Sequence, residues 1–407
     1  MAIDNKDKKV LKSSIEREQN EVACSAECEK IKGSKNLNVP HLRFPEFSGE
    51  WNKYTINDLA TVVGGGTPDT TVKSYWGGDI QWFTPSEIGK NKYVDFSKRT
   101  ITRDGLDNSS AKLLPLHTIL LSSRATVGEC SIASNECTTN QGFQSLIAKQ
   151  CNIDFLYYLI QTKKKDLIRN ACGSTFLEIS ANEIRKIKVA VPVQNEQEQI
   201  AKLLSLIDER IATQNKIIED LKKLKSAISE RLFKSVKGFT VLLSDLCDIV
   251  KGKQINGENL SDSGNYYVMN GGTEPSGYYD NYNVEASTIS ISEGGNSCGY
   301  VQFNTSPFWS GGHCYSIQNI ADKVDNMYLY HYLKSNEDAI MKLRIGSGLP
   351  NIQKKDLAMF KIIVPKIEWQ IKISTFLSSL ERKAEIEERI QNVMQKQKLY
   401  LLQQMFI

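Results

Sequence analysis

The side chains best suited to catalysis, the histidines and cysteines, are scattered along this chain. The four histidines are His41, His117, His313 and His331, and none stands in a known catalytic or zinc-binding spacing. The nine cysteines include no C-x-x-C pair, which argues against a zinc ribbon and a disulfide framework. The sequence also lacks a G-x-x-x-x-G-K-[ST] phosphate loop, a G-x-S-x-G turn and an H-E-x-x-H motif. We therefore expect no catalytic residue, no metal site and no cofactor in this chain.

Residue types that suit nucleic-acid binding recur in glycine-rich stretches such as GGGTP, YWGGD, NGGTEPSGYY, EGGN and SGGH. Cations neutralise phosphates, while amides and aromatic rings suit the edges and faces of bases. In the first half the candidates are Lys73, Tyr75, Trp76, Arg99, Arg103 and Arg124. In the second half they are Lys251, Lys253, Gln254, Asn270, Tyr278, Tyr279, Asn296, His313 and Arg344. An ordinary solvated surface explains any one of these residues, but the whole set favours binding.

Length and composition place these candidates in a modular globular protein. A chain of 407 residues suits two domains of ordinary size. Its hydrophobic fraction of 40% and charged fraction of 24% are typical of folded soluble proteins. The net charge of +4 permits nucleic-acid binding without requiring it. The charged N-terminus is unlike a secretory signal, so we expect a cytoplasmic protein.

An internal repeat organises the chain. The segment GSTFLEISANEIRKIKVAVP ends at Pro192 and GSGLPNIQKKDLAMFKIIVP ends at Pro365, so the repeat offset is 365 minus 192, or 173 residues. The same offset holds without a gap from Leu156, which matches Leu329, to Phe233, which matches Phe406. Further upstream the match loosens and the loops differ. The sequence therefore predicts two halves that share a backbone framework and differ in the loops that they expose.

A long helix is predicted after each of these prolines. In the first, apolar residues follow alternating steps of four and three, with Gln214 and Lys225 at the two missing positions. This seam consists of Ile200, Leu204, Ile207, Ile211, Ile218, Leu221, Ile228 and Leu232. The second seam begins with Ile373, Leu377, Leu380 and Ala384, then drifts through Ile386, Ile390, Val393 and Met394 before it ends at Leu401 and Met405. Helices of about 40 residues, roughly 60 Å long, need a partner helix along most of their length.

The remaining segments alternate β-branched and aromatic runs with glycine-rich loops, which is typical of mixed α/β domains. The expected fold class is mixed α+β, with two similar globular domains separated by two long antiparallel coiled-coil helices in a pseudo-twofold internal repeat. The predicted boundaries are 39–190 and 238–364 for the globular domains and 191–237 and 365–407 for the helices. Residues 1–38 are polar and without periodicity, so we expect them to be largely disordered.

Several of these motifs together resemble one known family. The sequence VPHLRFPEFSGEW, the run YWGGDIQWFTPSEI, and the repeated pattern of a Val-Pro pair, a Gln and an Ile-x-x-x-Leu-Ser helix start resemble the specificity subunit of type I restriction-modification enzymes. The resemblance covers about residues 39–407. It implies two target-recognition domains, each of which reads one half of a bipartite double-stranded DNA site. It also implies that the two paired helices set the spacer between the half-sites.

The resemblance further implies a division of labour among subunits. Two methylation subunits, carrying an adenine-N6 methyltransferase that uses S-adenosylmethionine, would dock on the helices. Two restriction subunits that use ATP and Mg would join them in the cleaving complex. This chain itself would then have no turnover, in agreement with the missing catalytic motifs.

Two other interpretations compete with this one. The first is an enzyme that uses Glu87, Asp104 or Glu293 as an acid or base, which the absence of a clustered catalytic set disfavours. The second is a coiled-coil adaptor whose globular parts bind protein without sequence-selective DNA binding. The sequence specifies neither the target bases nor the spacer length.

Overall fold

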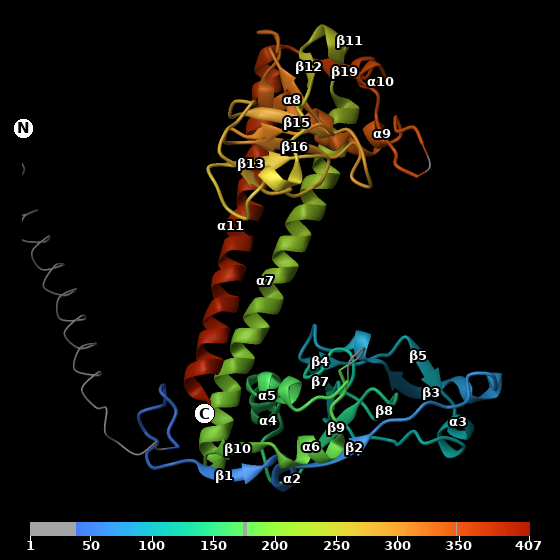
Figure 1. The fold of residues 1–407 in the computed structure, drawn as a ribbon, viewed down its shortest axis with the longest axis vertical. Helices are drawn as coiled ribbons and strands as arrows, with labels where there is room; N and C mark the ends of the chain where they lie inside the picture. The colour runs from blue at the N-terminus through green and yellow to red at the C-terminus, as the bar shows by residue number, and fades with distance from the viewer. Residues whose placement is uncertain (1–37, 174–176, 347) are drawn as a thin grey trace, which may run out of the picture. The chain divides into compact units, whose positions relative to one another are not determined.

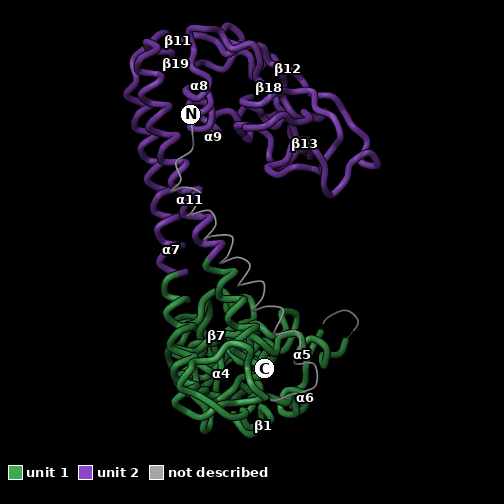
Figure 2. Tube along the Cα trace, turned by 90° about the vertical axis from the view of Figure 1, so that its left-hand side faces the viewer, with its two compact units in different colours: residues 1–210, 394–407 green, residues 211–393 purple. Residues whose placement is uncertain are grey.

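The structure, a computed structural model, describes residues 38–173, 177–346 and 348–407. Residues 1–37 of the segment expected to be disordered lie outside the described residues. The chain divides into two compact units, shown in Figure 2: unit 1 comprises the chain up to Arg210 together with Met394–Ile407, and unit 2 comprises Ile211–Val393. Each long helix therefore contributes one part of its length to each unit. Among the described residues, no helix combines the length and hydropathy that a membrane span requires.

Unit 1 contains three small sheets and a set of short helices (Figure 1). Its five-stranded sheet has the order β2 (Ala60–Gly64), β9 (Gln144–Ala148), β6 (Ile119–Leu121), β7 (Cys130–Ala133) and β4 (Tyr93–Val94). A three-stranded sheet has the order β5 (Arg99–Ile101), β3 (Trp76–Phe83) and β8 (Cys137–Thr139). The strands β1 (Asn52–Thr55) and β10 (Lys188–Val191) form an antiparallel pair. The short helices among the described residues of this unit are α2 (Ile56–Leu59), α3 (Arg103–Asp107), α4 (Ile153–Thr162), α5 (Lys164–Arg169) and α6 (Ala181–Lys186), with the 3-10 turns η1 (Lys73–Tyr75) and η2 (Pro85–Glu87).

Unit 2 repeats much of this plan. Its four-stranded sheet has the order β12 (Asp248–Lys251), β18 (Cys314–Gln318), β15 (Thr288–Ser292) and β16 (Val301–Asn304). A three-stranded sheet has the order β14 (Tyr278–Tyr279), β13 (Tyr266–Met269) and β17 (Trp309–Ser310). The strands β11 (Phe239–Leu242) and β19 (Lys361–Val364) pair antiparallel, as β1 and β10 do. The helices are α8 (Asn326–Ser335), α9 (Glu337–Met341) and α10 (Lys354–Ala358), with the 3-10 turns η3 (Leu243–Asp245) and η4 (Gly257–Asn259).

The central helix of each unit begins at a matched capping residue. The side chain of Asn152 accepts a hydrogen bond from the backbone N–H of Phe155 and begins α4, and Asp325 accepts one from Tyr328 and begins α8. Such caps satisfy one of the N–H groups that a helix leaves free at its start. Each helix is interrupted after ten residues, at Lys163 and at Asn336.

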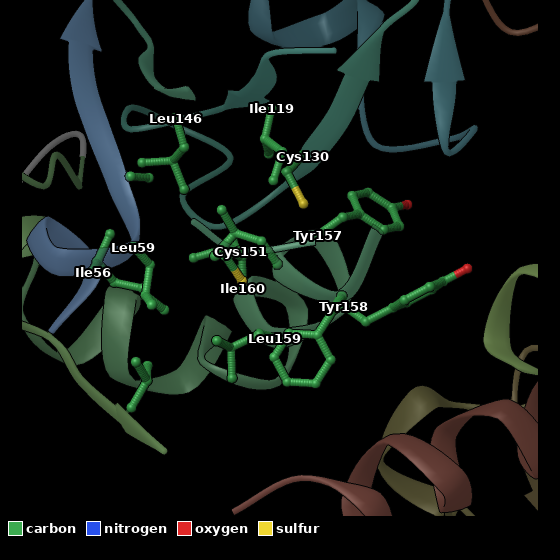
Figure 3. Close-up of a cluster of buried hydrophobic side chains, with 14 of the residues drawn as sticks. Ile56, Leu59, Ile119, Cys130, Leu146, Cys151, Tyr157, Tyr158, Leu159 and Ile160 are labelled. Atoms are coloured by element: carbon green, nitrogen blue, oxygen red, sulfur yellow. The ribbon is translucent and has the colours of Figure 1, made fainter. Parts of the chain in front are cut away.

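Helix α4 is the centre of the unit 1 core. Its six consecutive residues from Phe155 to Ile160 are buried, as expected for a helix enclosed on all sides. Figure 3 shows Tyr157, Leu159 and Ile160 in one cluster with Ile119 and Leu146 of the five-stranded sheet. The start of the long helix α7 (Gln194–Ser235) contributes further buried residues to the same cluster. Burying each large apolar side chain contributes about 1.5–3 kcal/mol, so α4 holds sheet and long helix together.

A buried glutamine joins each long helix to its own globular part. In unit 1, the Oε1 atom of Gln197 accepts a hydrogen bond from the backbone N of Asn152 at 3.0 Å, and its Nε2 donates to the carbonyl of Pro192 at 3.0 Å. In unit 2, Gln370 accepts from the backbone N of Asp325 at 2.8 Å and donates to the carbonyl of Pro365 at 2.9 Å. The same three repeat positions therefore make the same junction twice.

The long helices α7 and α11 (Ile367–Met405) pair antiparallel within each unit, as Figure 1 shows. The predicted seam residues of α7 are all buried or half-buried, and so are Ile373, Leu377, Leu380 and Met405 of α11. The expected course of the second seam is wrong at Ile386, Ile390 and Val393, which are exposed, and correct at Ala384, Met394 and Leu401, which are half-buried. Steps of four and three instead continue through half-buried positions that include polar residues: Ala384, Glu387, Gln391, Met394, Lys398 and Leu401.

Polar contacts between α7 and α11 explain why the apolar pattern of the sequence did not predict the register of α11. Gln214 Nε2 donates to Glu387 Oε2 at 2.6 Å, and Gln391 donates to Asn215. Lys225 Nζ lies 2.6 Å from Glu381 Oε1. The polar interruptions of one helix therefore face polar residues of the other, and a pattern of apolar residues cannot follow them.

Candidate nucleic-acid interface

Four loop segments of unit 2 converge into what we call the glycine-rich loop cluster, residues 251–254, 270–272, 293–296 and 310–313. Backbone hydrogen bonds hold the segments together, from Lys253 N to Ser310 O at 2.8 Å and from Gly311 N to Met269 O at 2.8 Å. The side chain of Asn270 accepts a hydrogen bond from His313 N at 3.1 Å. Glycines allow this close approach, because a Cβ on Gly311 would lie 2.6 Å from Asn270 Oδ1. The sequence candidates Lys251, Lys253, Gln254, Asn270, Asn296 and His313 all lie in this cluster.

A buried carboxylate lies at the base of the cluster. Glu293 directly follows β15, and its side chain is 10% exposed. Its Oε1 atom accepts hydrogen bonds from Lys251 Nζ at 2.6 Å and from the Tyr315 hydroxyl at 3.1 Å. Burial and the Glu293 charge raise the pKa of Tyr315, which therefore keeps its donor proton. Glu293 begins the glycine-rich stretch EGGN, but its residue type, an anion and not a cation, amide or aromatic ring, left it out of the binding candidates.

Aromatic candidates flank the loop cluster. The rings of Tyr279 and Trp309 meet edge to face with centroids 5.1 Å apart, and Trp309 Nε1 donates to the carbonyl of Lys253 at 2.9 Å. Tyr278 is the neighbouring residue of the short strand β14 and is half-buried. Arg344 is exposed, and its charge opposes the rise that burial causes in the pKa of Cys298. The second-half candidates therefore border one region of unit 2.

In unit 1, five candidates gather near Trp76, the first residue of β3. The guanidinium carbon of Arg99 lies 3.6 Å from the ring centroid of Trp76, a cation–π stack. Trp82 supports it, with its ring 5.0 Å from that of Trp76. Tyr75 accepts a hydrogen bond from Thr102 N through its carbonyl at 2.9 Å. Lys73, in the turn η1, and Arg103, at the start of α3, are exposed beside them.

Arg124 does not join this group. It lies in the loop after β6, where its Nε atom is 3.8 Å from Glu178 Oε2 in an exposed ion pair. This loop matches the one that begins at Glu293 in unit 2, because Arg124 bridges to Glu178 and Gly294 bridges to Asn351. Unit 1 therefore presents candidates at two places.

The carboxylates weighed for a catalytic alternative have structural partners. Glu87 accepts hydrogen bonds from Thr84 and, at 2.6 Å, from Lys98 N. Asp104 is an exposed residue in the first turn of α3. Within residues 38–173, 177–346 and 348–407, no group of three or more His, Cys, Asp or Glu side chains could hold a metal ion. His331 is buried, and burial lowers its pKa to about 4.

The fold defines a duplicated α/β protein in which each repeat carries a loop-bearing globular part and a long helix. The model of the family described as the type I restriction modification DNA specificity domain matches residues 48–223 and, again, residues 238–396. The chain belongs to this family. The resemblance seen in the sequence and the expected fold class, with two repeats and two long helices, are thereby confirmed.

Individual relatives carry the same description. Over 192 residues the chain is 38% identical to the specificity subunit of type I restriction enzyme MjaIX from Methanocaldococcus jannaschii, which covers 45% of this chain and 44% of that subunit. The chain thus spans less than half the length of this relative. The EcoprrI specificity subunit from Escherichia coli is 24% identical over 367 residues, 82% of this chain and 87% of that subunit.

A solved structure shows the same fold. The S subunit of a type I restriction-modification system from M. genitalium superposes with a TM-score of 0.62 over 91% of this chain and 99% of that chain, at 19% identity.

Proposed function

We propose that this chain is the sequence-reading subunit of a type I restriction-modification complex and that it has no catalytic activity of its own. In this proposal units 1 and 2 each read one half of a bipartite double-stranded DNA site. This function places the chain in the cytoplasm, the compartment that holds the chromosome. The observation that carries the proposal is a repeated backbone frame whose exposed loops differ between the copies.

The paired helices are proposed to set the spacer and to dock two methylation subunits. Exposed apolar side chains support docking, because a solvated helix pair has no need of them. On α11 they include Trp369, which is 58% exposed, Phe376, at 47%, and Val393, at 55%. On α7 they include Ile217 and Leu224.

The chemistry is assigned to the partners. The methylation subunits would transfer a methyl group from S-adenosylmethionine to adenine N6, and two restriction subunits would use ATP and Mg in a cleaving complex. The proposed role of this chain is to bind DNA at specific bases and to hold the partner subunits at a fixed separation.

The first test is methylome sequencing. The chain is co-expressed with its cognate methylation subunit in a host free of adenine methylation, and genomic DNA is read by single-molecule sequencing. N6-methyladenine at one split motif is expected, and exchange of residues 41–190 for those of a relative should alter one half of that motif. With a soluble, assembled complex, DNA without methylation would overturn the proposal and favour the protein-binding adaptor.

A further inference from the structure

Glu293 occupies a position that both units build with the same backbone frame. In unit 2, Glu293 N donates to His313 O at 2.8 Å and Glu293 O accepts from Ile352 N at 2.8 Å. In unit 1, Ser123 N donates to Gly142 O at 2.8 Å and Ser123 O accepts from Ile179 N at 2.9 Å. Ile179 and Ile352 are related by the 173-residue repeat offset. Ser123 and Glu293 are therefore equivalent positions.

The side chains around this position differ between the units, although the frame does not. Strand pairing places Lys251 opposite Tyr315 in unit 2 and Gly64 opposite Gln144 in unit 1. His313 stands where unit 1 has Gly142. Unit 2 thus has a charged and aromatic set where unit 1 has small or neutral residues. A position that keeps its backbone and changes its chemistry is what two readers of different half-sites require.

Buried polar atoms without partners mark the position in both units. The Oε2 atom of Glu293 is buried and, among the described residues, has no hydrogen-bond partner. In unit 1 the same is true of Ser123 Oγ and of Gln144 Oε1. Buried polar atoms are normally paired in folded proteins, so unpaired atoms at equivalent sites point to an external partner.

An exposed side chain and two glycines lie beside the Oε2 atom of Glu293. The Nδ1 atom of His313 lies 3.7 Å from Oε2, beyond hydrogen-bond distance, and the His313 side chain is 62% exposed. Gly294 and Gly295 border the same place, and a Cβ on Gly295 would meet no atom within 4 Å. A base that reaches Oε2 would require the exposed His313 side chain to move aside.

We propose that Glu293 is a base-reading residue of unit 2, whose Oε2 atom accepts a hydrogen bond from the exocyclic amino group of cytosine or adenine. In the major groove only these two bases present such a donor, at cytosine N4 and adenine N6. Guanine and thymine present acceptor oxygens there, which a carboxylate repels. Lys251 and Tyr315 hold Oε1 and leave Oε2 for the base. This inference rests on the proposed function.

The test compares Glu293→Gln with Glu293→Asp and with Glu258→Gln, the same amide substitution at an exposed residue of unit 2. Each chain is assembled with its methylation subunit, and affinity is measured for duplexes that carry each of the four bases at every position of the second half-site. The wild-type complex should favour cytosine or adenine at one position by at least about tenfold. Glu293→Gln should lower that preference about tenfold, because its amide also donates to guanine O6 or thymine O4. Glu293→Asp, which keeps the charge, should retain the preferred base, and Glu258→Gln should behave like the wild type.

The outcomes separate the proposals. If Glu293→Gln weakens binding to all four bases equally, Glu293 only holds Lys251 and the base-reading role is overturned. It is also overturned if the preference is unchanged, or if Glu258→Gln changes it as much. A wild-type complex without any split motif would instead refute the proposed function. Circular dichroism of each complex confirms that the variants are folded.

Discussion

Gln214 and Glu387 are hydrogen-bonded to each other although they are the same position of the two repeats, 173 residues apart. The Gln214 amide donates to the Glu387 carboxylate at 2.6 Å and to its backbone carbonyl at 3.1 Å. A contact between equivalent positions of two copies is typical of an isologous interface. Two ion pairs near this contact show the same symmetry. In unit 1, Asp208 pairs with Lys398. In unit 2 their repeat equivalents, Glu381 and Lys225, form the corresponding pair.

The Lys225–Glu381 pair should contribute measurably to stability. Both side chains are mostly buried, and the Tyr330 hydroxyl also donates to Glu381 at 3.2 Å. A double-mutant cycle of Lys225→Met and Glu381→Gln, followed by urea unfolding, should give a coupling free energy of about 1 kcal/mol. The exposed Lys234–Glu230 pair is the control and should give a clearly smaller coupling free energy. Equal coupling for the two pairs would contradict this assignment.

Removing the glutamine junction should destabilise each unit. Gln197→Leu would leave the backbone N–H of Asn152 without its acceptor, at a cost of about 1–3 kcal/mol in the free energy of unfolding. Gln370→Leu should cost a similar amount through Asp325. Exposed Gln395→Leu serves as the control and should change stability little. Chemical denaturation measures the stability of all three variants. Unchanged stability of Gln197→Leu and Gln370→Leu would contradict a stabilising role of the glutamine junction.

Buried His331 should make stability depend on pH. Burial lowers its pKa to about 4 in the folded state, against 6.5 when solvated. The unfolded chain therefore binds the extra proton between these values, so stability should be complete above about pH 6.5 and fall as the pH drops toward 4, by about 3 kcal/mol in full.

The repeat supplies the matched variant for this test. Tyr158 stands at the equivalent position in unit 1, and its hydroxyl contacts Ser205 and Asp208. His331→Tyr should therefore fold and should reduce the loss of stability between pH 8 and pH 5 in urea titrations. If the variant loses as much as the wild type, another group causes the pH dependence.

The stacked arginine of unit 1 should affect only one half of the DNA motif. Arg99→Ala removes the cation that stacks on Trp76 and should weaken specific binding by about 1–3 kcal/mol, with relaxed preference in the first half-site alone. Arg169→Ala, an exposed and ion-paired arginine of the same unit, is the control. Loss of preference in the second half-site, or equal effects of the two variants, would refute this role.

Lengthening the paired helices should lengthen the spacer. One heptad inserted after Ile211 in α7 and one after Met394 in α11 preserves the antiparallel register and adds roughly 10 Å, or about three base pairs of DNA. Methylome sequencing should show both half-sites unchanged and a longer spacer. The same insertion in α7 alone should instead impair assembly, because the seam positions no longer match. Methylation at the original spacing would contradict the role of the helices as a spacer.

The sequence predicted the parts of this fold that depend on repetition and period. The offset of 173 residues, the two long helices and the mixed α/β class follow from patterns of apolar residues, glycine and proline. The register of α11 was lost because Glu387, Gln391 and Lys398 interrupt its apolar pattern, and only the facing helix shows their partners. Polar pairs between distant segments leave no periodic signal.

The candidate interface was only partly foreseeable. Residue type identified Lys251, Asn270 and His313, and these lie together in the structure. Glu293 gave no comparable signal, because a single glutamate in a glycine-rich loop is ordinary until Lys251 and Tyr315 are placed against it. The roles of the individual candidates in binding remain predictions.

The contact between Gln214 and Glu387 also bears on how such a chain can evolve. In a symmetric dimer of one repeat, the residue at this position would face an identical residue, and two glutamates would repel each other while two glutamines would not. A fused chain is free of that constraint, since each copy can mutate alone. A fused chain can therefore carry complementary residues at this position, such as Gln214 and Glu387, and the loops of its two copies can diverge in the same way.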